Sequence, residues 1–112
     1  MVSYMGALKS MDIVKLKRPT DFLILEAFAE EGRNVAANIA ILIDKKRSYV
    51  NTRLPELEGY RLLQRVGPSP NSGLYEITDR GRAALELRSE YSRDPKFEQM
   101  VDERAQEIRG RP

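Results

Sequence analysis

The 112-residue chain contains no cysteine and no histidine. Without cysteine it can form neither a disulfide bond nor a thiolate metal site. Without histidine it has no Ser-His or Cys-His nucleophile pair and no imidazole metal ligand. Its acidic residues are scattered among basic ones with no clustered pair, which is typical of a solvated surface. We therefore expect no enzymatic activity, no catalytic residue, no metal site and no cofactor.

Long apolar runs are also missing. No stretch approaches the ~18 consecutive apolar residues that a membrane span needs, so we expect no membrane insertion. The start of the chain lacks the apolar region of a secretory signal, although Met1, Met5 and Met11 could each be the natural start. Apolar residues form 41% of the chain, enough for one domain with a small core. We predict a cytoplasmic protein.

Neither sign of charge predominates, because 19 Lys and Arg residues against 17 Asp and Glu residues give a net charge of only +2. Its distribution is more informative than its sum. Residues 1–19 carry four basic side chains against one acidic, and residues 44–65 carry six against three. Residues 20–43 carry one basic side chain against four acidic ones. Positive charge thus gathers on an amino-terminal arm and on a central segment.

Helical periodicity organises the first half of the chain. Pro19 resists helix before it, and Thr20 or Asp21 can cap the first helix, which Gly32 ends. Asn34 is expected to cap a short second helix rich in small and apolar residues. The second and third helices are expected at about residues 35–43 and 46–58.

The third helix has an apolar stripe formed by Val50, Leu54 and Leu57. On a helical wheel, Ser48 and Thr52 lie opposite that stripe. Tyr49 flanks them on one side and Asn51 on the other. Pro55 deletes one helical hydrogen bond and conflicts locally with the helix.

A hairpin and two further helices follow. Residues 62–66 and 74–78 read as paired strands, joined by turn-forming Pro, Asn, Ser and Gly residues. Thr78 is expected to cap a helix starting near Asp79. Asp94 and Pro95 should end it and start a last helix, over residues 95–109. This order of elements predicts an α+β, mainly α, winged helix-turn-helix with a two-stranded wing and an added C-terminal helix.

Several short motifs are distributed over about residues 21–85: Ile24-Leu25-Glu26, Gly32-Arg33-Asn34, Ala37-Asn38-Ile39-Ala40, Arg47-Ser48-Tyr49-Val50-Asn51, Arg53-Leu54-Pro55-Glu56-Leu57, Gly67-Pro68, Ser72-Gly73-Leu74-Tyr75-Glu76-Ile77-Thr78 and Gly81-Arg82-Ala83-Ala84-Leu85. Together they resemble archaeal winged helix-turn-helix transcriptional regulators, in particular the repressor-like proteins of haloarchaeal phages. The end of the wing is also distantly similar to MarR-like regulators. The resemblance implies a DNA-binding transcriptional regulator that forms a homodimer. We predict a sequence-specific, double-stranded DNA-binding repressor.

Two departures from that pattern affect the expected site. Arg61 stands where such proteins usually place Gly, so Arg61 is expected to adopt a left-handed conformation. The wing tip has no Lys or Arg between Val66 and Thr78. A phosphate grip by the wing would therefore need backbone N–H groups or neutral side chains, and we expect a small wing contribution.

The predicted DNA-binding site lies mainly on the third helix, whose polar side chains can hydrogen-bond base edges. The same residues also have explanations that involve no DNA contact: a solvated helix face, surface ion pairs for the cations, and packing of Tyr49 on the second helix. Arg80 and Arg82 are additional phosphate candidates. The predicted base-reading residues are Ser48, Tyr49, Asn51 and Thr52. The predicted phosphate contacts are Lys45, Lys46, Arg47, Arg53, Arg65, Ser69, Asn71 and Ser72.

The chain divides into an arm (1–19), a winged domain (20–93) and a C-terminal helix (94–112). That helix carries an apolar stripe, which could fold back on its own domain or pair with a second copy. A single amphipathic helix needs a partner, and we favour the dimer because a winged core of this size leaves little uncovered apolar surface for a trailing helix. The alternative function is a winged-helix protein-interaction module, and a third is general chromatin or single-strand binding. The predicted dimer interface is Phe97, Met100, Val101, Ala105 and Ile108.

Overall fold

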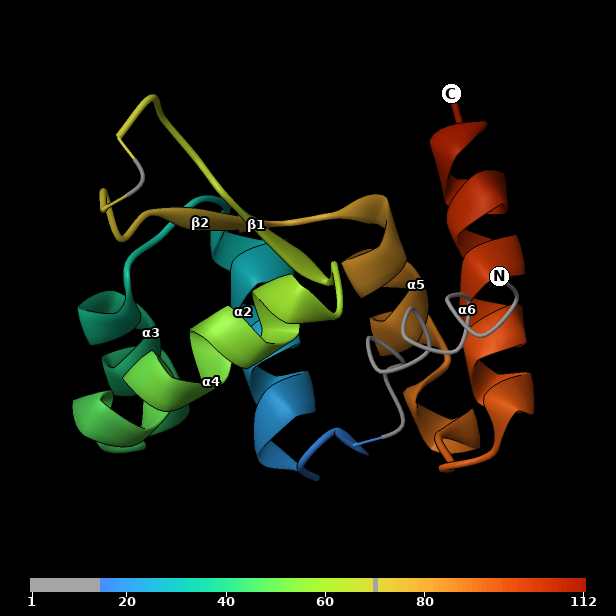
Figure 1. Cartoon of the computed structure of the whole chain (residues 1–112), viewed down its shortest axis with the longest axis horizontal. Helices are drawn as coiled ribbons and strands as arrows, with labels where there is room; N and C mark the ends of the chain where they lie inside the picture. The colour runs from blue at the N-terminus through green and yellow to red at the C-terminus, as the bar shows by residue number, and fades with distance from the viewer. Residues whose placement is uncertain (1–14, 70) are drawn as a thin grey trace, which may run out of the picture.

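The computed structural model describes residues 15–69 and 71–112. The possible natural starts Met1, Met5 and Met11 lie outside the described residues. The described chain is α+β and mainly helical, with winged-helix topology, which confirms the predicted fold class (Figure 1). Its elements are α2 (Thr20–Glu31), α3 (Ala36–Ile43), α4 (Arg47–Gly59), β1 (Leu63–Arg65), β2 (Tyr75–Ile77), α5 (Asp79–Glu86), the 3₁₀ helix η3 (Arg88–Glu90) and α6 (Pro95–Arg109).

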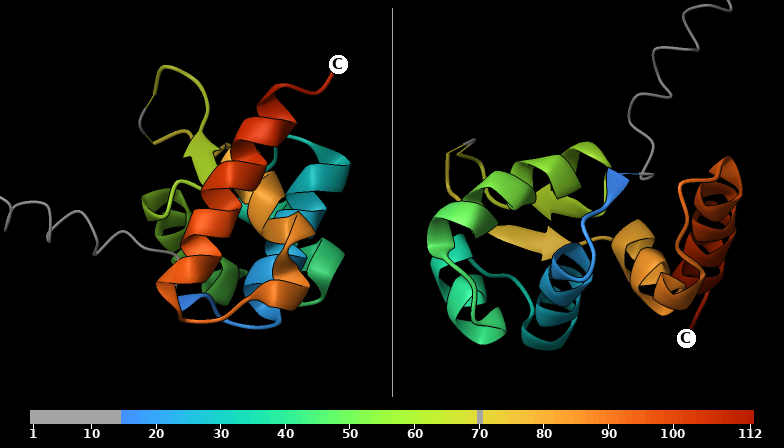
Figure 2. Two further views of the ribbon diagram at one scale, coloured as in Figure 1. Left: turned by 90° about the vertical axis from the view of Figure 1, so that its right-hand side faces the viewer. Right: turned by 90° about the horizontal axis from the view of Figure 1, so that it is seen from below.

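Helix α2 lies at the centre of the molecule. Helices α3 and α4 and the wing lie on one side of it, and α5 and α6 lie on the other (Figures 1 and 2). Its Ile24, Leu25 and Phe28 are fully buried, because α2 is apolar on almost every face. The buried Ala36 and Ala40 of α3 have no bulk to hold neighbouring helices apart. Small side chains therefore let α3 pack closely against both α2 and α4.

The wing is an antiparallel pair in which Leu63 faces Ile77 and Arg65 faces Tyr75. Backbone hydrogen bonds continue one residue further at each end, from Val66 N to Leu74 O and from Thr78 N to Leu62 O. The predicted strands, 62–66 and 74–78, match this ladder. Asn34 also bridges Tyr75, so the α2–α3 loop is fastened to the wing.

Two special backbone positions join the wing to the helices. Arg61 has φ of 65°, which confirms the left-handed conformation expected at this position. Gly81 stands against the backbone of Leu62, and a Cβ at this position would overlap the Leu62 carbonyl oxygen. The Thr78 hydroxyl accepts from Gly81 N at 2.9 Å, as the predicted cap requires. The start of α5 can therefore lie directly against the backbone that leads into β1 only because residue 81 is a glycine.

The other two predicted caps are wrong. Helix α2 has no side-chain cap, because Asp21 is buried and serves another partner. Helix α3 has Val35 at its N-cap, while the Asn34 side-chain oxygen accepts from Val35 N and from Asn38 Nδ2. Both polar residues stand near the helix starts, but Asp21 binds the distant Arg53, and Asn34 binds the backbone and side chain of its neighbours Val35 and Asn38.

Helix α6 begins and ends where the sequence predicted, and Asp94 caps it by accepting from Lys96 N. It packs along α5 (Figure 2). Phe97, Val101 and Ala105 are buried in the core of their own chain, and Met100 and Ile108 pack against it. Tyr91 meets Phe97 edge-on at 5.2 Å between ring centroids. The predicted dimer interface is therefore corrected: this stripe covers its own domain, the other of the two readings.

Candidate nucleic-acid interface

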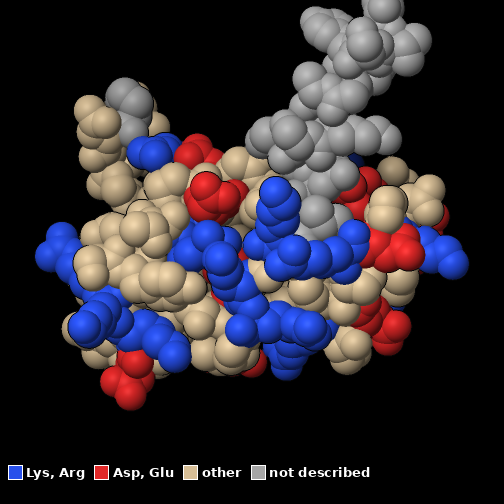
Figure 3. Space-filling view, turned by 60° about the horizontal axis from the view of Figure 1, so that its bottom comes forward, with Lys and Arg blue, Asp and Glu red and all other residues tan. Residues whose placement is uncertain are grey.

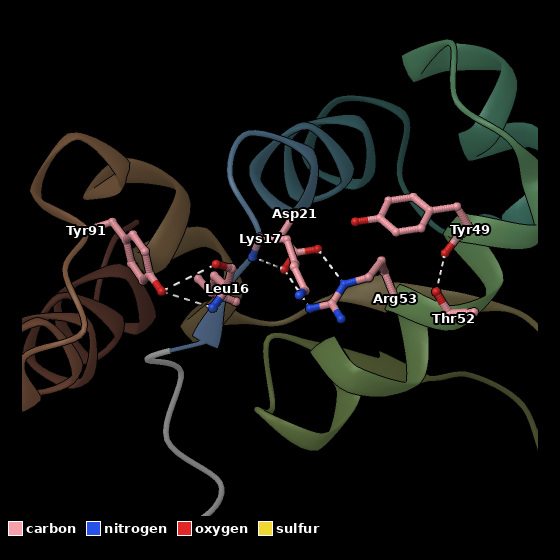
Figure 4. A network of polar contacts seen from close by, with 7 residues as sticks. All are labelled: Leu16, Lys17, Asp21, Tyr49, Thr52, Arg53 and Tyr91. Atoms are coloured by element: carbon pink, nitrogen blue, oxygen red, sulfur yellow. Dashed lines mark hydrogen bonds and ion pairs between the residues drawn. The ribbon is translucent and has the colours of Figure 1, made fainter.

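The outward surface of α4 has a centre and two flanks. Ser48 and Thr52 occupy the centre, opposite the buried Val50 and Leu54. On the wing flank, Arg47, Asn51 and Pro55 line a groove whose far side is Ser72 and Gly73 of the wing. On the opposite flank, Tyr49 and Arg53 lie toward the start of α2 (Figure 4). The helix thus presents polar side chains between two walls.

The four predicted base-reading residues are all exposed and are brought together on this one surface. Tyr49 is 38% exposed, so part of its surface remains open to a ligand. The Thr52 hydroxyl donates to Tyr49 O at 2.6 Å (Figure 4), which leaves its oxygen able to accept but not to donate. Within the described residues, Ser48 and Asn51 make no side-chain hydrogen bond, so both retain their full hydrogen-bonding capacity.

Three cations surround the amino-terminal end of α4. Lys45, Lys46 and Arg47 are all exposed. No carboxylate of the described chain lies within ion-pair distance of any of them. An unpaired cation beside a helix N-terminus adds to the positive end of the helix dipole, so this corner favours an anion.

Arg53 differs from the other predicted phosphate contacts. It is only 8% exposed, and its Nε and Nη2 donate to the two carboxylate oxygens of Asp21 at 2.9 and 2.8 Å (Figure 4). Asp21 is fully buried, and hydrogen bonding to it raises the pKa of the Arg53 guanidinium above its ordinary value. The geometry argues against a phosphate role, because binding phosphate would strand a buried carboxylate.

The wing is nearly neutral in charge. Arg65 pairs with Glu58 at 3.0 Å and lies over the Tyr75 ring, and Arg33 pairs with Glu76 at 3.0 Å. Hydrogen bonds from Gln64 and Arg33 hold the pKa of the Glu76 carboxyl below its ordinary value. Arg65 is thus a weaker phosphate candidate than its sequence position indicated.

The polar residues of the wing tip largely bind each other. The Ser69 hydroxyl accepts from Asn71 N at 3.2 Å. The Ser72 hydroxyl donates to Val66 O at 2.8 Å and accepts from Leu74 N at 3.3 Å. These bonds shape the turn, so Ser69 and Ser72 have less left to offer a phosphate than the exposed Asn71 side chain.

Arginines near α5 and α6 are mostly paired. Arg80 donates to Tyr60 O, Glu98 and Asp102, which removes it from the phosphate candidates, while Arg82 is exposed without an ion pair among the described residues. Hydrogen bonds from Arg111, and then Arg104, lower the pKa of Glu86 below its ordinary value. The fixed ion pairs of this end serve the packing of α6 on α5.

Positive charge on the amino-terminal arm was expected from the sequence, but none of its residues was predicted to belong to the site. Lys15, Lys17 and Arg18 are exposed and lie in the segment leading into α2. Lys and Arg side chains gather on the face that contains the start of α2 and the α3–α4 turn (Figure 3). Charge counting along the chain was the one available signal, and it could not show that the segment lies beside α4.

Comparison with known proteins adds no assignment: no family model, curated protein or solved structure matches the chain. No helix in residues 15–69 and 71–112 is long and apolar enough to cross a membrane. The same residues hold no group of three or more acidic side chains suited to a metal ion. The functional argument therefore rests on the geometry and charge of the described surface.

Proposed function

We propose that the protein is a sequence-specific, double-stranded DNA-binding transcriptional regulator that reads its site with α4. The observation that carries the proposal is the surface of α4 itself. Four exposed polar side chains share one face, and three cations without ion pairs stand at its amino-terminal end. A winged-helix domain can place such a helix in the major groove, where base edges carry a distinct donor and acceptor pattern.

In this mechanism the side chains of α4 divide the work. Asn51 has a donor and an acceptor on one amide, which suits the two groups that adenine presents in the major groove. Ser48 can donate or accept, whereas Thr52 is left mainly as an acceptor by its bond to Tyr49 O. Lys45, Lys46 and Arg47 set the register by binding phosphates.

Repression follows most simply if the bound protein occupies an operator and blocks polymerase. A homodimer reading two half-sites about 34 Å apart remains part of the proposal. Its interface has to be sought away from the α6 stripe, because that stripe is buried in its own chain. The proposed location is the cytoplasm.

Selection of bound sequences from a random duplex library tests the proposal directly. We expect an enriched motif, and a palindromic one if a dimer reads two half-sites. The selected duplex should lose binding to an Asn51→Ala variant more than a random duplex does. Absence of enrichment with a folded, monodisperse protein would contradict sequence-specific binding.

One observation favours the alternative, a protein-interaction module. Ile41 is 79% exposed and Leu42 50% exposed, both on α3. Large apolar side chains at such exposure often mark contact surfaces. Leu42→Ser separates the two functions: Leu42 lies with Leu23 and Glu26 of α2 and not with the cations of α4, so the change should leave duplex affinity unchanged if α4 binds DNA. Ile41 is unsuited to this test, because it lies beside Lys45 and Arg47. If DNA selection fails and Leu42→Ser abolishes self-association or partner binding, the interaction module is the better account.

A further inference from the structure

The segment before α2 is fixed to the domain by a set of polar contacts (Figure 4). Leu16 is buried, its N–H donates to the Tyr91 hydroxyl at 3.0 Å, and that hydroxyl lies 3.4 Å from Leu16 O. Lys17 N–H donates to Asp21 Oδ2 at 2.7 Å. The Arg18 guanidinium lies over the Tyr91 ring at 5.0 Å. Residues 16–18 therefore hold a defined position on the surface.

That position is next to α4. The Asp21 carboxylate accepts both the Lys17 N–H and the Arg53 guanidinium, so one buried group joins the segment to the helix (Figure 4). Arg53 lies on the flank of α4 that faces away from the wing groove. The segment thus borders one side of the reading helix, and the wing borders the other side.

The two sides differ in charge. On the wing side, Arg65 and Arg33 are each paired with a glutamate. On the segment side, Lys15, Lys17 and Arg18 are exposed, and no carboxylate within the described residues pairs with them. Figure 3 shows Lys and Arg side chains spread across the face that contains the start of α2 and the α3–α4 turn. Asp21 does not offset them, because Arg53 already neutralises it.

We propose that Lys15, Lys17 and Arg18 form a second phosphate-binding surface, which grips the DNA backbone beside the groove that α4 enters. The inference rests on the proposed function and deepens it. It places the main backbone contact on the amino-terminal side of α4 instead of on the wing. The recognised chemistry is a row of phosphodiesters, because exposed cations on adjacent residues match a repeating anionic chain and need no base identity.

The salt dependence of duplex binding tests the inference. The slope of log K against log salt is about −0.9 per neutralised phosphate on B-DNA. The double variant Lys15→Gln/Lys17→Gln should flatten that slope by about 2 and weaken binding on the order of tenfold near 0.1 M salt, for selected and random duplexes alike. Arg111→Gln is the control, because it removes one positive charge at the far end of α6 (Figure 1).

The outcomes separate this inference from the proposed function. If the wild-type protein binds no duplex, the proposed function fails and the inference falls with it. If the wild-type protein binds and the double variant keeps its slope, only the second phosphate surface is overturned. A change in slope of about half that size in Arg111→Gln, which removes one charge where the double variant removes two, would also overturn it, because the effect would then follow net charge and not position.

Tyr91→Phe tests whether the segment must be held in place. It removes the hydroxyl that binds Leu16 and keeps both the aromatic ring and the net charge. We expect a several-fold weaker duplex affinity and a slope between those of the wild type and the double variant, with base preference unchanged. A wild-type slope in a Tyr91→Phe protein would overturn the positioning role of Tyr91.

Discussion

The surface around α4 and the start of α2, and the end of the molecule formed by α5 and α6, are both rich in basic residues. The two regions differ in whether those residues form ion pairs. At the α5–α6 end, Arg80, Arg104 and Arg111 each bind a carboxylate. Around α4 and the start of α2, six cations have no such partner in the described chain: Lys15, Lys17, Arg18, Lys45, Lys46 and Arg47. A paired arginine is already neutralised, whereas an unpaired cation can still attract an anion.

This difference explains how a chain with a net charge of only +2 can present a basic surface. Carboxylates are concentrated where arginines hold helices together, and they are sparse where the cations face solvent. A sum over the sequence counts both kinds equally. The relevant quantity for a polyanionic partner is the charge left unpaired on one face.

The largest change in stability should come from a substitution at the α5–α6 end. Phe97→Ala removes a ring that is 1% exposed and lies against Tyr91, so the free energy of unfolding should fall by about 3–5 kcal/mol. Denaturant titration measures the change, and sedimentation of the folded variant shows whether self-association survives. A folded variant of near-wild-type stability that becomes monomeric would show that α6 forms the dimer interface. The α5–α6 end would then not be a purely structural part of the molecule.

Arg53 is the exception on the α4 side, because it is paired and buried there. Arg53→Met leaves the buried Asp21 carboxylate with only the Lys17 N–H, and we expect a loss of about 3 kcal/mol in unfolding free energy. Adding Asp21→Leu should recover most of that loss, since it removes the stranded charge. Lys46→Met is the matched surface control, with a change within about 0.5 kcal/mol. Stability unchanged by Arg53→Met would assign Arg53 to the DNA contacts after all.

Much of the fold was predictable because local signals agreed with tertiary packing. Apolar periodicity, the turn-rich segment after Val66 and the Asp94-Pro95 pair predicted α4, the wing and α6 to within about a residue. The left-handed Arg61 was predicted from the family resemblance alone, because Gly usually stands at that position in the regulators that the sequence resembles. The role of Asp21 was not predictable, because its partner Arg53 is distant in sequence, and the helix start one residue after the expected cap at Asn34 was not predictable from the sequence either.

The site was less predictable than the fold. Exposure of Ser48 and Asn51 followed from helical phase alone. The pairing of Arg53 did not, because its partner Asp21 is 32 residues away and lies on another helix. The destination of the Phe97 stripe was ambiguous for a similar reason. An amphipathic helix requires a partner, but its sequence does not say whether that partner belongs to the same molecule.

Asn51→Ala should act on DNA binding without disturbing the fold, since the side chain is exposed and makes no hydrogen bond within the described residues. We expect a loss of about 1–3 kcal/mol on the best site and relaxed preference at one base position. Competition between selected and random duplexes measures both quantities. An equal loss on the two duplexes would assign Asn51 to contact with the DNA backbone. The base-reading and phosphate-binding surfaces would then be less distinct than we propose.

The smallest effect should have the opposite sign. Glu56 is exposed on α4 and close enough to influence the Arg53 guanidinium, so it lies on the flank that we assign to the phosphates. A carboxylate ~10 Å from a phosphate in water costs roughly 0.4 kcal/mol, and Glu56→Gln should therefore strengthen duplex binding about twofold for every sequence. The gain should shrink as salt rises, because screening already weakens the repulsion. Glu103→Gln, an equal charge change on the exposed side of α6, should leave the affinity unchanged. Fluorescence anisotropy at low salt resolves a twofold change, and equal gains in both variants would show that net charge, not the position of the carboxylate, controls DNA binding.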